Sequence, residues 1–156
     1  MSERLALAGR IQVSLEDLQR TIQRTVVIAE KARRSGDEDY WGTVALNLHG
    51  FYSGAEEIFE DIARTIDGSL PSGGEWHVNL LRQMTVEMEQ MRPAVIRSET
   101  RQCLDEYRGF RHIVRNVYAF NLRPARLAEL VSDAPQCLSK LTDDLLAFID
   151  FLKKTA

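Results

Sequence analysis

The chain has few of the residues that mark disulfide-rich, metal-dependent or membrane-spanning proteins. Its 156 residues include two cysteines, four prolines and nine glycines. No stretch approaches the roughly 20 consecutive apolar residues that a membrane-spanning helix needs. The first residues, MSERLALAGRIQ, mix charge with apolar residues and contain no small-residue cleavage site, so we expect no secretory signal peptide. These absences favour a cytoplasmic protein that does not bind a membrane.

The two cysteines do not form a metal-binding or redox motif. Cys103 and Cys137 lie on separate expected helices, and no CxxC spacing occurs. We therefore expect both to be reduced thiols that serve as packing residues. The hydrophobic fraction of 44% and the charged fraction of 28% are those of an ordinary globular protein. A chain of this length forms one domain, 1–156, and can bury a core without metal or disulfide support.

Helical periodicity runs through the chain, and no strand pattern, internal repeat or low-complexity segment interrupts it. The predicted fold is all-α, a mostly antiparallel bundle of four long helices plus one or more short ones. The helices are expected at about Ser2–Arg34, Glu38–Ile66, Trp76–Gln90, Glu99–Phe120 and Pro124–Val131, with a last one that follows Asp133 and Pro135. Asp37 or Asp39, Ser98 and Asp133 are suitable N-caps.

Three features that suggest chemistry have simpler explanations. The loop DGSLPSGGE, 67–75, lacks the lysine and the preceding strand of a P-loop. In the acidic run EEIFED, Glu57 and Glu60 have the spacing of a magnesium-binding pair, but no other helix offers a second pair, so a solvated face is favoured and no metal is expected. His49 lies beside an apolar stripe and is expected to be a hydrogen-bonded packing residue, and His77 is assigned no role.

The most unusual stretch is YRGFRHIVRNVYAFNLRPAR, 107–126. It carries five arginines, one histidine and no acidic residue, in a chain of net charge −3. On a helix, one arc of roughly 160° collects the polar groups. That arc holds Tyr118, Arg111, Arg115, Arg108, Ala119, His112 and Asn116, and the opposite arc holds Phe120, Ile113, Val117, Phe110, Val114 and Tyr107. A solvated face would mix Glu with Lys, so this pattern indicates an amphipathic helix whose front meets a phosphate-bearing partner.

Part of this helix, FRHIVRNVYAF, resembles the signature of HEPN-domain ribonuclease toxins of the HepT type. That signature has an arginine, four intervening residues, a histidine, one more residue and a tyrosine. Arg111 matches the arginine and Tyr118 the tyrosine, whereas Asn116 stands at the histidine position. The block ALNLHGFYSGAEEIFEDIARTIDGSLPSGGEWHVNLLRQM, 45–84, and the following RPAV, 92–95, are also similar to HepT-like proteins. The resemblance covers most of the chain from about Tyr40 onward.

The resemblance implies a dimeric, metal-independent endoribonuclease of HEPN-like fold that needs no cofactor. It belongs to a type VII toxin–antitoxin pair, in which a histidine assists attack of an RNA 2′-hydroxyl on the adjacent phosphate. Arg111 would hold that phosphate, because a guanidinium contacts two phosphate oxygens at once, while Arg108 and Arg115 would bind the RNA backbone. Asn116 cannot titrate, so the missing base would be His112, on the same face. The alternative is that His112 and Asn116 only form hydrogen bonds across a dimer interface.

Tyr118 has a role of its own in the family scheme. A minimal nucleotidyltransferase antitoxin transfers AMP to this tyrosine, and the added charge would neutralise the cleft beside Arg111 and Arg115. An ordinary interface tyrosine is the alternative. Two functions therefore stay open: a toxin that cleaves RNA, or a catalytically inactive HEPN subunit that binds nucleotide or a nucleotidyltransferase. Asn116 favours the second, and the retained Arg111, His112, Arg115 and Tyr118 favour the first.

Overall fold

The structure is a computed structural model that describes residues 2–110 and 123–156. Its helices are α1 (Glu3–Ser35), α2 (Glu38–Ile62), α3 (Trp76–Met84), α4 (Ser98–Gly109) and α6 (Pro124–Lys154), and a short π-helical segment, Ala63–Asp67, continues α2. No β-sheet forms among the described residues. The predicted all-α fold is confirmed. No helix in the described part of the chain is long and apolar enough to cross a membrane.

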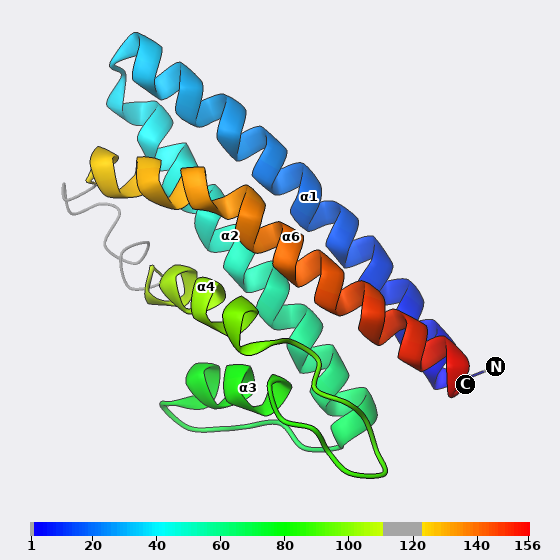
Figure 1. The fold of residues 1–156 in the computed structure, drawn as a ribbon. Coiled ribbons are helices and arrows are strands. Elements are labelled where there is room, and N and C mark those ends of the chain that lie inside the picture. Colours follow the sequence, from blue (N-terminus) through cyan, green and yellow to red (C-terminus); the bar gives the residue numbers. More distant parts are fainter. Residues whose placement is uncertain (1, 111–122) are drawn as a thin grey trace.

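Three long helices make the body of the bundle (Figure 1). α1 runs antiparallel to α2 and α6, and all three lie side by side along their length. α3 and α4 pack on one flank of this body, against α2 and, for α4, against α6. The two ends of the chain meet at one end of the bundle, where Arg4 Nη1 donates a hydrogen bond of 3.0 Å to Thr155 Oγ1. The arrangement is the mostly antiparallel bundle that the periodicity predicts.

The turn between α1 and α2 follows from its residues. Gly36 ends α1 with φ of 69°, a conformation that glycine adopts without steric cost. Asp37 then starts α2, because its carboxylate accepts a hydrogen bond of 2.9 Å from the backbone N–H of Asp39. Asp37 is thus the N-cap, as one of the two predicted candidates. The helix continues through the π-helical turn to Gly68, close to the predicted end at Ile66.

The core lies between α1, α2 and α6. The helical period predicts one apolar stripe along the second helix, from Trp41 to Ile66, and all of it except Ile66 is buried: Trp41, Val44, Ala45, Leu48, Phe51, Tyr52, Ala55, Ile58, Phe59 and Ile62. At Gly54 the two first helices approach closely, since a Cβ atom there would lie 2.6 Å from Leu18 Cδ2. α2 can bury so wide a face because it has neighbours on more than one side.

α3 is shorter than predicted: it ends at Met84 instead of Gln90. The Met84 carbonyl accepts hydrogen bonds from Val95 N at 2.8 Å and Ile96 N at 3.2 Å. The backbone of the returning segment therefore caps the C-terminal end of α3. Met88 and Met91 therefore lie beyond the end of α3.

A buried arginine explains why the chain turns back at this point. Arg92 forms an ion pair with Asp67, with Nε–Oδ1 at 2.5 Å and Nη2–Oδ2 at 2.8 Å, and both side chains are fully buried. Its other donors reach the carbonyls of Gln83, Val86 and Pro93. A helix that ran on to Gln90 would use the carbonyls of Gln83 and Val86 in its own backbone hydrogen bonds, so they would no longer be available to the guanidinium.

The two helices predicted for the C-terminal part are one helix. α6 begins at Pro124, as expected for a proline in the first turn, and runs through Pro135 without a break. The predicted cap at Asp133 is wrong. Proline removes one backbone hydrogen bond, but buried residues on both sides of it share one apolar face: Leu127, Leu130, Val131, Ala134, Cys137 and Leu141. Packing along this continuous face outweighs the lost bond.

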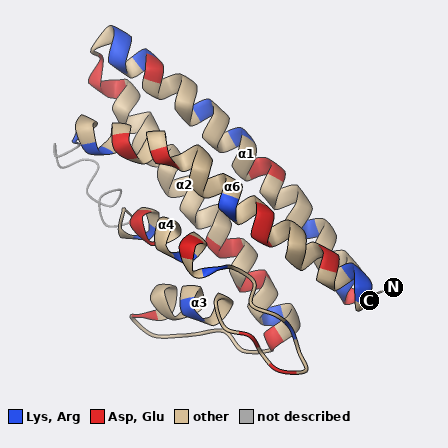
Figure 2. Cartoon of the chain, in the orientation of Figure 1, with Lys and Arg blue, Asp and Glu red and all other residues tan. Residues whose placement is uncertain are grey.

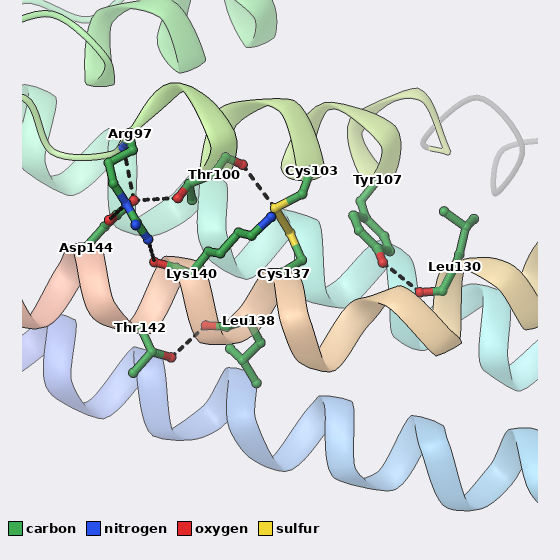
Figure 3. Close-up of a disulfide and its surroundings, with 10 residues drawn as sticks. All are labelled: Arg97, Thr100, Cys103, Tyr107, Leu130, Cys137, Leu138, Lys140, Thr142 and Asp144. Atoms are coloured by element: carbon green, nitrogen blue, oxygen red, sulfur yellow. Dashed lines mark hydrogen bonds and ion pairs between the residues drawn. A yellow bond between two sulfur atoms is a disulfide. The ribbon is translucent and has the colours of Figure 1, made fainter.

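α4 is attached to α6 through a buried carboxylate (Figure 3). Asp144 accepts hydrogen bonds from Arg97 N at 3.0 Å and Arg97 Nε at 2.6 Å, and from Thr100 Oγ1 at 2.5 Å. The residue before the helix is therefore Arg97, and Ser98, the predicted N-cap, is the first residue of α4. The start of α4 is thus held by a carboxylate of α6 instead of by the side chain of its own N-cap residue.

The two cysteines are joined. Cys103 of α4 and Cys137 of α6 form a disulfide, with Cα atoms 5.8 Å apart (Figure 3). The prediction of two reduced packing thiols is thus wrong, although Cys137 is buried as expected. The helical periods of α4 and α6 each turn one cysteine toward the contact between these helices, and no sequence spacing reports that contact.

Candidate functional site

The predicted site residues fall on the end of α4 and beyond it. Arg108 belongs to the described part of the chain, in the last turn of α4. Arg111, His112, Arg115, Asn116 and Tyr118 lie outside the described residues.

The end of α4 is amphipathic in the way that the sequence predicts. Tyr107 and Phe110 are buried, whereas the Arg108 side chain is 28% exposed. The Tyr107 ring packs edge-to-face on Phe51 of α2 at 5.4 Å, and its hydroxyl donates a hydrogen bond of 2.6 Å to the carbonyl of Leu130 in α6. Tyr107 thus anchors this turn to two helices, and the anchor fixes the direction in which Arg108 leaves the helix.

Arg108 forms an ion pair with an aspartate of the same helix. Its Nε lies 2.6 Å from Asp105 Oδ1, and this bond, together with the charges of Asp105 and of Glu75, which precedes α3, holds the pKa of the guanidinium above its usual range. Figure 2 shows acidic and basic residues interspersed along the described helices. A phosphate at Arg108 would therefore compete with Asp105 for the guanidinium.

A histidine without a predicted role is paired with a carboxylate of another helix. His77, in the first turn of α3, has Nδ1 2.6 Å from Glu56 Oε2 of α2. The side chains are 17% and 11% exposed, and the Trp76 indole stacks on the imidazole with ring centroids 3.6 Å apart. The carboxylate and the indole hold the imidazole in one orientation. Such a pair can orient a ring for proton exchange, as in carboxylate–histidine pairs of hydrolases.

Tyr52 interacts electrostatically with both Glu56 and Arg108. It lies one helical turn before Glu56, and its hydroxyl is buried with no hydrogen-bond partner among the described residues. Burial raises the pKa of this phenol well above its usual range, and the charge of Glu56 adds to the effect, while Arg108 opposes it. The Tyr52 ring therefore stays neutral, and Glu56 of the same helix and Arg108 of α4 act on it in opposite directions.

The acidic run of α2 has two roles in the structure. Glu60 pairs with Arg64 at 2.8 Å on the helix surface, and Glu57 is exposed, which agrees with a solvated face. Glu56 is instead buried and paired with His77. Within residues 2–110 and 123–156 no three His, Cys, Asp or Glu side chains gather closely enough to hold a metal ion.

The described residues that line two open grooves along α1 and α2 do not include Arg108. One is lined by residues of both helices around Arg10 and Asp61, and another by Arg20, Arg24, Lys31 and Asn47. They belong to a different part of the bundle from α4.

Sequence reasoning missed the His77–Glu56 pair because its members lie on different helices, on either side of a loop. A signal was present in α2. Glu56 belongs to the acidic run predicted to be a solvated face, and for this residue that prediction is wrong. It lies one turn after Tyr52, which was predicted to be buried, and a buried carboxylate needs a partner. The loop 67–75 makes α2 and α3 neighbours, which leaves His77 as a natural partner.

A family model described as HepT-like protein matches residues 43–152. The matched region contains most of α2, all of α3 and α4 and nearly all of α6, together with the arginine-rich segment. No curated protein and no solved structure matches the chain.

Proposed function

Since the chain belongs to the HepT-like protein family, we propose that it is a HepT-type toxin, a metal-independent endoribonuclease that a nucleotidyltransferase partner silences by AMP transfer. The observation that carries this proposal is the family match over residues 43–152, which includes the arginine-rich segment. The anchored turn at Tyr107 and Arg108, which leads into that segment, supports it. The toxin acts in the cytoplasm, where its RNA substrate and its partner are.

In this function the arginines bind the phosphate to be cleaved. Arg111 holds the reacting phosphate, because a guanidinium donates two parallel hydrogen bonds and stabilises the charge that develops on the phosphorane. Arg115 and Arg108 bind the RNA backbone on either side. Arg108 does so by exchanging its partner Asp105 for a phosphate. The affinity for RNA should therefore fall as the salt concentration rises.

The residues proposed to transfer protons depart from the family signature. Asn116 can donate or accept a hydrogen bond but carries no proton that titrates near neutral pH. His112 takes the proton of the attacking 2′-hydroxyl instead, since it is the imidazole in the arginine-rich segment. Asn116 orients the substrate.

Cleavage of total RNA in the presence of EDTA tests the function. Wild type should cleave, Arg111→Ala should lose roughly 10²–10³-fold in rate, and His112→Ala roughly 10²–10⁴-fold. Asn116→His should preserve or raise the activity. Arg82→Ala is the matched control, because Arg82 is an exposed arginine of α3, and circular dichroism should show that every variant stays helical. Equal cleavage by wild type and His112→Ala would disprove the proposed base.

The toxin acts as a homodimer that forms through the arginine-bearing helix. Arginine and tyrosine are enriched at protein interfaces, and both occur repeatedly in the segment 107–126. Light scattering at micromolar concentration should give twice the monomer mass of 17.8 kDa. A monomeric mass would contradict the dimer.

Tyr118 is the proposed site of silencing. Its phenol oxygen attacks the α-phosphate of ATP in the partner enzyme, forms an O–P bond and releases pyrophosphate. The AMP group then places negative charge beside Arg111 and Arg115 and blocks RNA. Incubation with the cognate nucleotidyltransferase and ATP should add AMP to the chain, and Tyr118→Phe should abolish the addition. Full modification of the Phe variant would move the site to another residue.

One observation favours a second function. Asn116 stands where the family signature has its histidine. A subunit without that histidine would be catalytically inactive and would only bind nucleotide or a nucleotidyltransferase. The RNA assay separates the two functions. If wild type never cleaves and Asn116→His does, the chain is a silenced binding subunit.

A further inference from the structure

An open groove along the second half of α1 is lined mainly by hydrogen-bond donors. Its volume is about 980 Å³, and all of its described lining residues but one belong to α1. They are Asp17, Arg20, Thr21, Gln23, Arg24, Val27, Ile28, Lys31 and, from α2, Asn47. The three basic residues follow one another at steps of four and seven, so they lie on one face of α1 and span roughly 16 Å along it. The groove therefore presents a row of positive charge.

Two of these cations have no carboxylate partner. Arg20 forms an ion pair with Asp17, the acidic residue of the described lining. Glu30, next to Lys31 in the chain, is paired with two other arginines of α1. The side chains of Arg24 and Lys31 are exposed and form no hydrogen bond or ion pair within residues 2–110 and 123–156. Their charges are thus available to a ligand.

The other groove along α1 and α2 has a different charge pattern. Its basic side chains are paired with carboxylates of the chain itself: Arg10 with Asp61 and Arg64 with Glu60, each at 2.8 Å. An anionic ligand would have to displace those carboxylates. In the groove at Arg24 it would instead supply a partner that the described part of the chain does not provide.

The helix dipole does not explain the row of basic residues. Cations in the last turn of a helix are stabilised by its negative end, and this accounts for Arg33 and Arg34. Arg24 lies about three turns before the end of α1, where that effect has decayed. The acidic residues that begin α2, 37–39, do not line the groove. The positive charge is therefore a property of the groove and not of the helix end.

We propose that this groove binds the phosphate backbone of single-stranded RNA, and the identity of the strand rests on the proposed ribonuclease function. Nucleic-acid interfaces are polar and positively charged, whereas protein interfaces are depleted of charged residues at their core. Arg24 and Lys31 each contact a phosphate. Asn47 adds a donor, because its amide nitrogen has no acceptor among the described residues and can turn about a broad χ2 torsion.

The shape and lining of the groove define what it recognises. The axes of two packed helices lie about 8–10 Å apart, so a groove between them admits one strand and not a duplex. None of its described lining residues is aromatic, so no base stacks there. The binding is therefore independent of base sequence and depends on salt.

Fluorescence anisotropy with a fluorescein-labelled 2′-O-methyl oligouridine measures the binding. The protein cannot cleave this probe, because its 2′-oxygens carry no proton. The groove variant is Arg24→Gln with Lys31→Gln. The matched control, Arg82→Gln with Lys153→Gln, removes the same charge from an exposed arginine of α3 and an exposed lysine of α6. A third variant, Arg24→Lys with Lys31→Arg, keeps the charge, and circular dichroism checks the fold of all three.

The groove variant should lose two phosphate contacts. Each contact with a single strand contributes about 0.7 to the slope of log K against log salt concentration, so the slope should fall by about 1.4. At about 0.1 M salt this corresponds to roughly 25-fold weaker binding. The matched control and the variant that keeps the charge should bind nearly as wild type does.

Equal binding by the groove variant and the matched control would overturn the proposal, as would a wild type that does not bind the probe in low salt. Labelled poly-L-glutamate tests an acidic protein as the occupant. If the groove variant loses this peptide and keeps the RNA, the groove binds an acidic segment and the proposal is wrong.

The binding assay and the cleavage assay fail separately. If wild type binds the probe through the groove but cleaves no RNA in EDTA, the proposed function fails and backbone binding by the groove stands. If wild type cleaves RNA and the groove variant binds the probe as the matched control does, the proposed function stands and the groove proposal is overturned.

Discussion

The body of the bundle and its flank are stabilised by different contacts. α1, α2 and α6 meet through apolar faces, and residues such as Phe59, Leu48 and Leu145 are fully buried there. α3 and α4 bury fewer apolar residues. They are fastened by polar and covalent ties that reach far along the chain: Arg92–Asp67, Asp144 with Arg97 and Thr100, His77–Glu56 and the disulfide Cys103–Cys137.

The difference matters because Arg108, the predicted site residue that the structure describes, lies on the flank. Polar ties are directional, so they fix the orientation of α3 and α4 where a small apolar area alone would fix it poorly. Apolar packing in the body supplies most of the free energy of folding, since it removes the largest area from water. The flank then holds Arg108 against a stable support.

The largest effect is expected in the body. Phe59→Ala should lower the free energy of unfolding by about 4 kcal/mol, because it removes a fully buried ring and leaves a cavity between packed helices. Urea denaturation of both proteins measures this. Leu46→Ala, at a side chain on the same helix that is 53% exposed, should change stability by less than about 0.5 kcal/mol. A similar loss for both variants would show that α2 does not bury the face described here.

The next effect sharpens the comparison. Arg92→Met should cost about 3 kcal/mol, although it introduces an apolar side chain, since it leaves Asp67 charged and buried without its ion-pair partner. Three backbone carbonyls lose a donor as well. Arg82→Met is the control at an exposed arginine of α3. If Arg92→Met unfolds at the same urea concentration as wild type, the flank does not depend on this tie.

The sequence predicted what the apolar period controls. The burial of α2 and the amphipathic turn at Tyr107 and Arg108 follow from spacing within one helix, and both are found. The early end of α3 and the unbroken α6 were missed, because Arg92 and the face around Pro135 act through contacts with other segments. Residue preferences for helix caps and helix breaks are overridden where packing between helices contributes more free energy.

The same division applies to the candidate site. The basic face near Arg108 could be identified from one helix, but the partner of His77 could not, because Glu56 lies 21 residues away on another helix. The disulfide was missed for the same physical reason: its cysteines are 34 residues apart, and only the packing of α4 on α6 brings them together. Pairs between helices need the helix order, which periodicity alone does not give.

A smaller effect is expected from the disulfide. Reduction, or the double variant Cys103→Ser with Cys137→Ser, should cost about 2–4 kcal/mol, because the bond closes a loop and restricts the unfolded chain. Thermal melts with and without reductant measure the loss in wild type, and the double variant should not respond to reductant. Mass spectrometry after alkylation without reductant should find no labelled thiol. Two labelled thiols in the oxidised protein would contradict the disulfide.

The smallest effect tests a surface tie in the body. Arg10 and Asp61 form two hydrogen bonds between α1 and α2, at 2.8 and 3.0 Å, but the arginine side chain is 51% exposed. Solvent screening should limit the coupling to about 0.5 kcal/mol.

The hydrogen bond from Arg10 holds the pKa of Asp61 below its usual value of about 4. The coupling is therefore fully present above that value and is lost as the pH falls through the lowered pKa of the folded state. A double-mutant cycle of Arg10→Ala and Asp61→Ala should thus give a small coupling at pH 7 that disappears in strong acid and weakens in high salt. A coupling that grew as the pH fell would contradict this ion pair and would weaken the contrast with the buried ties of the flank.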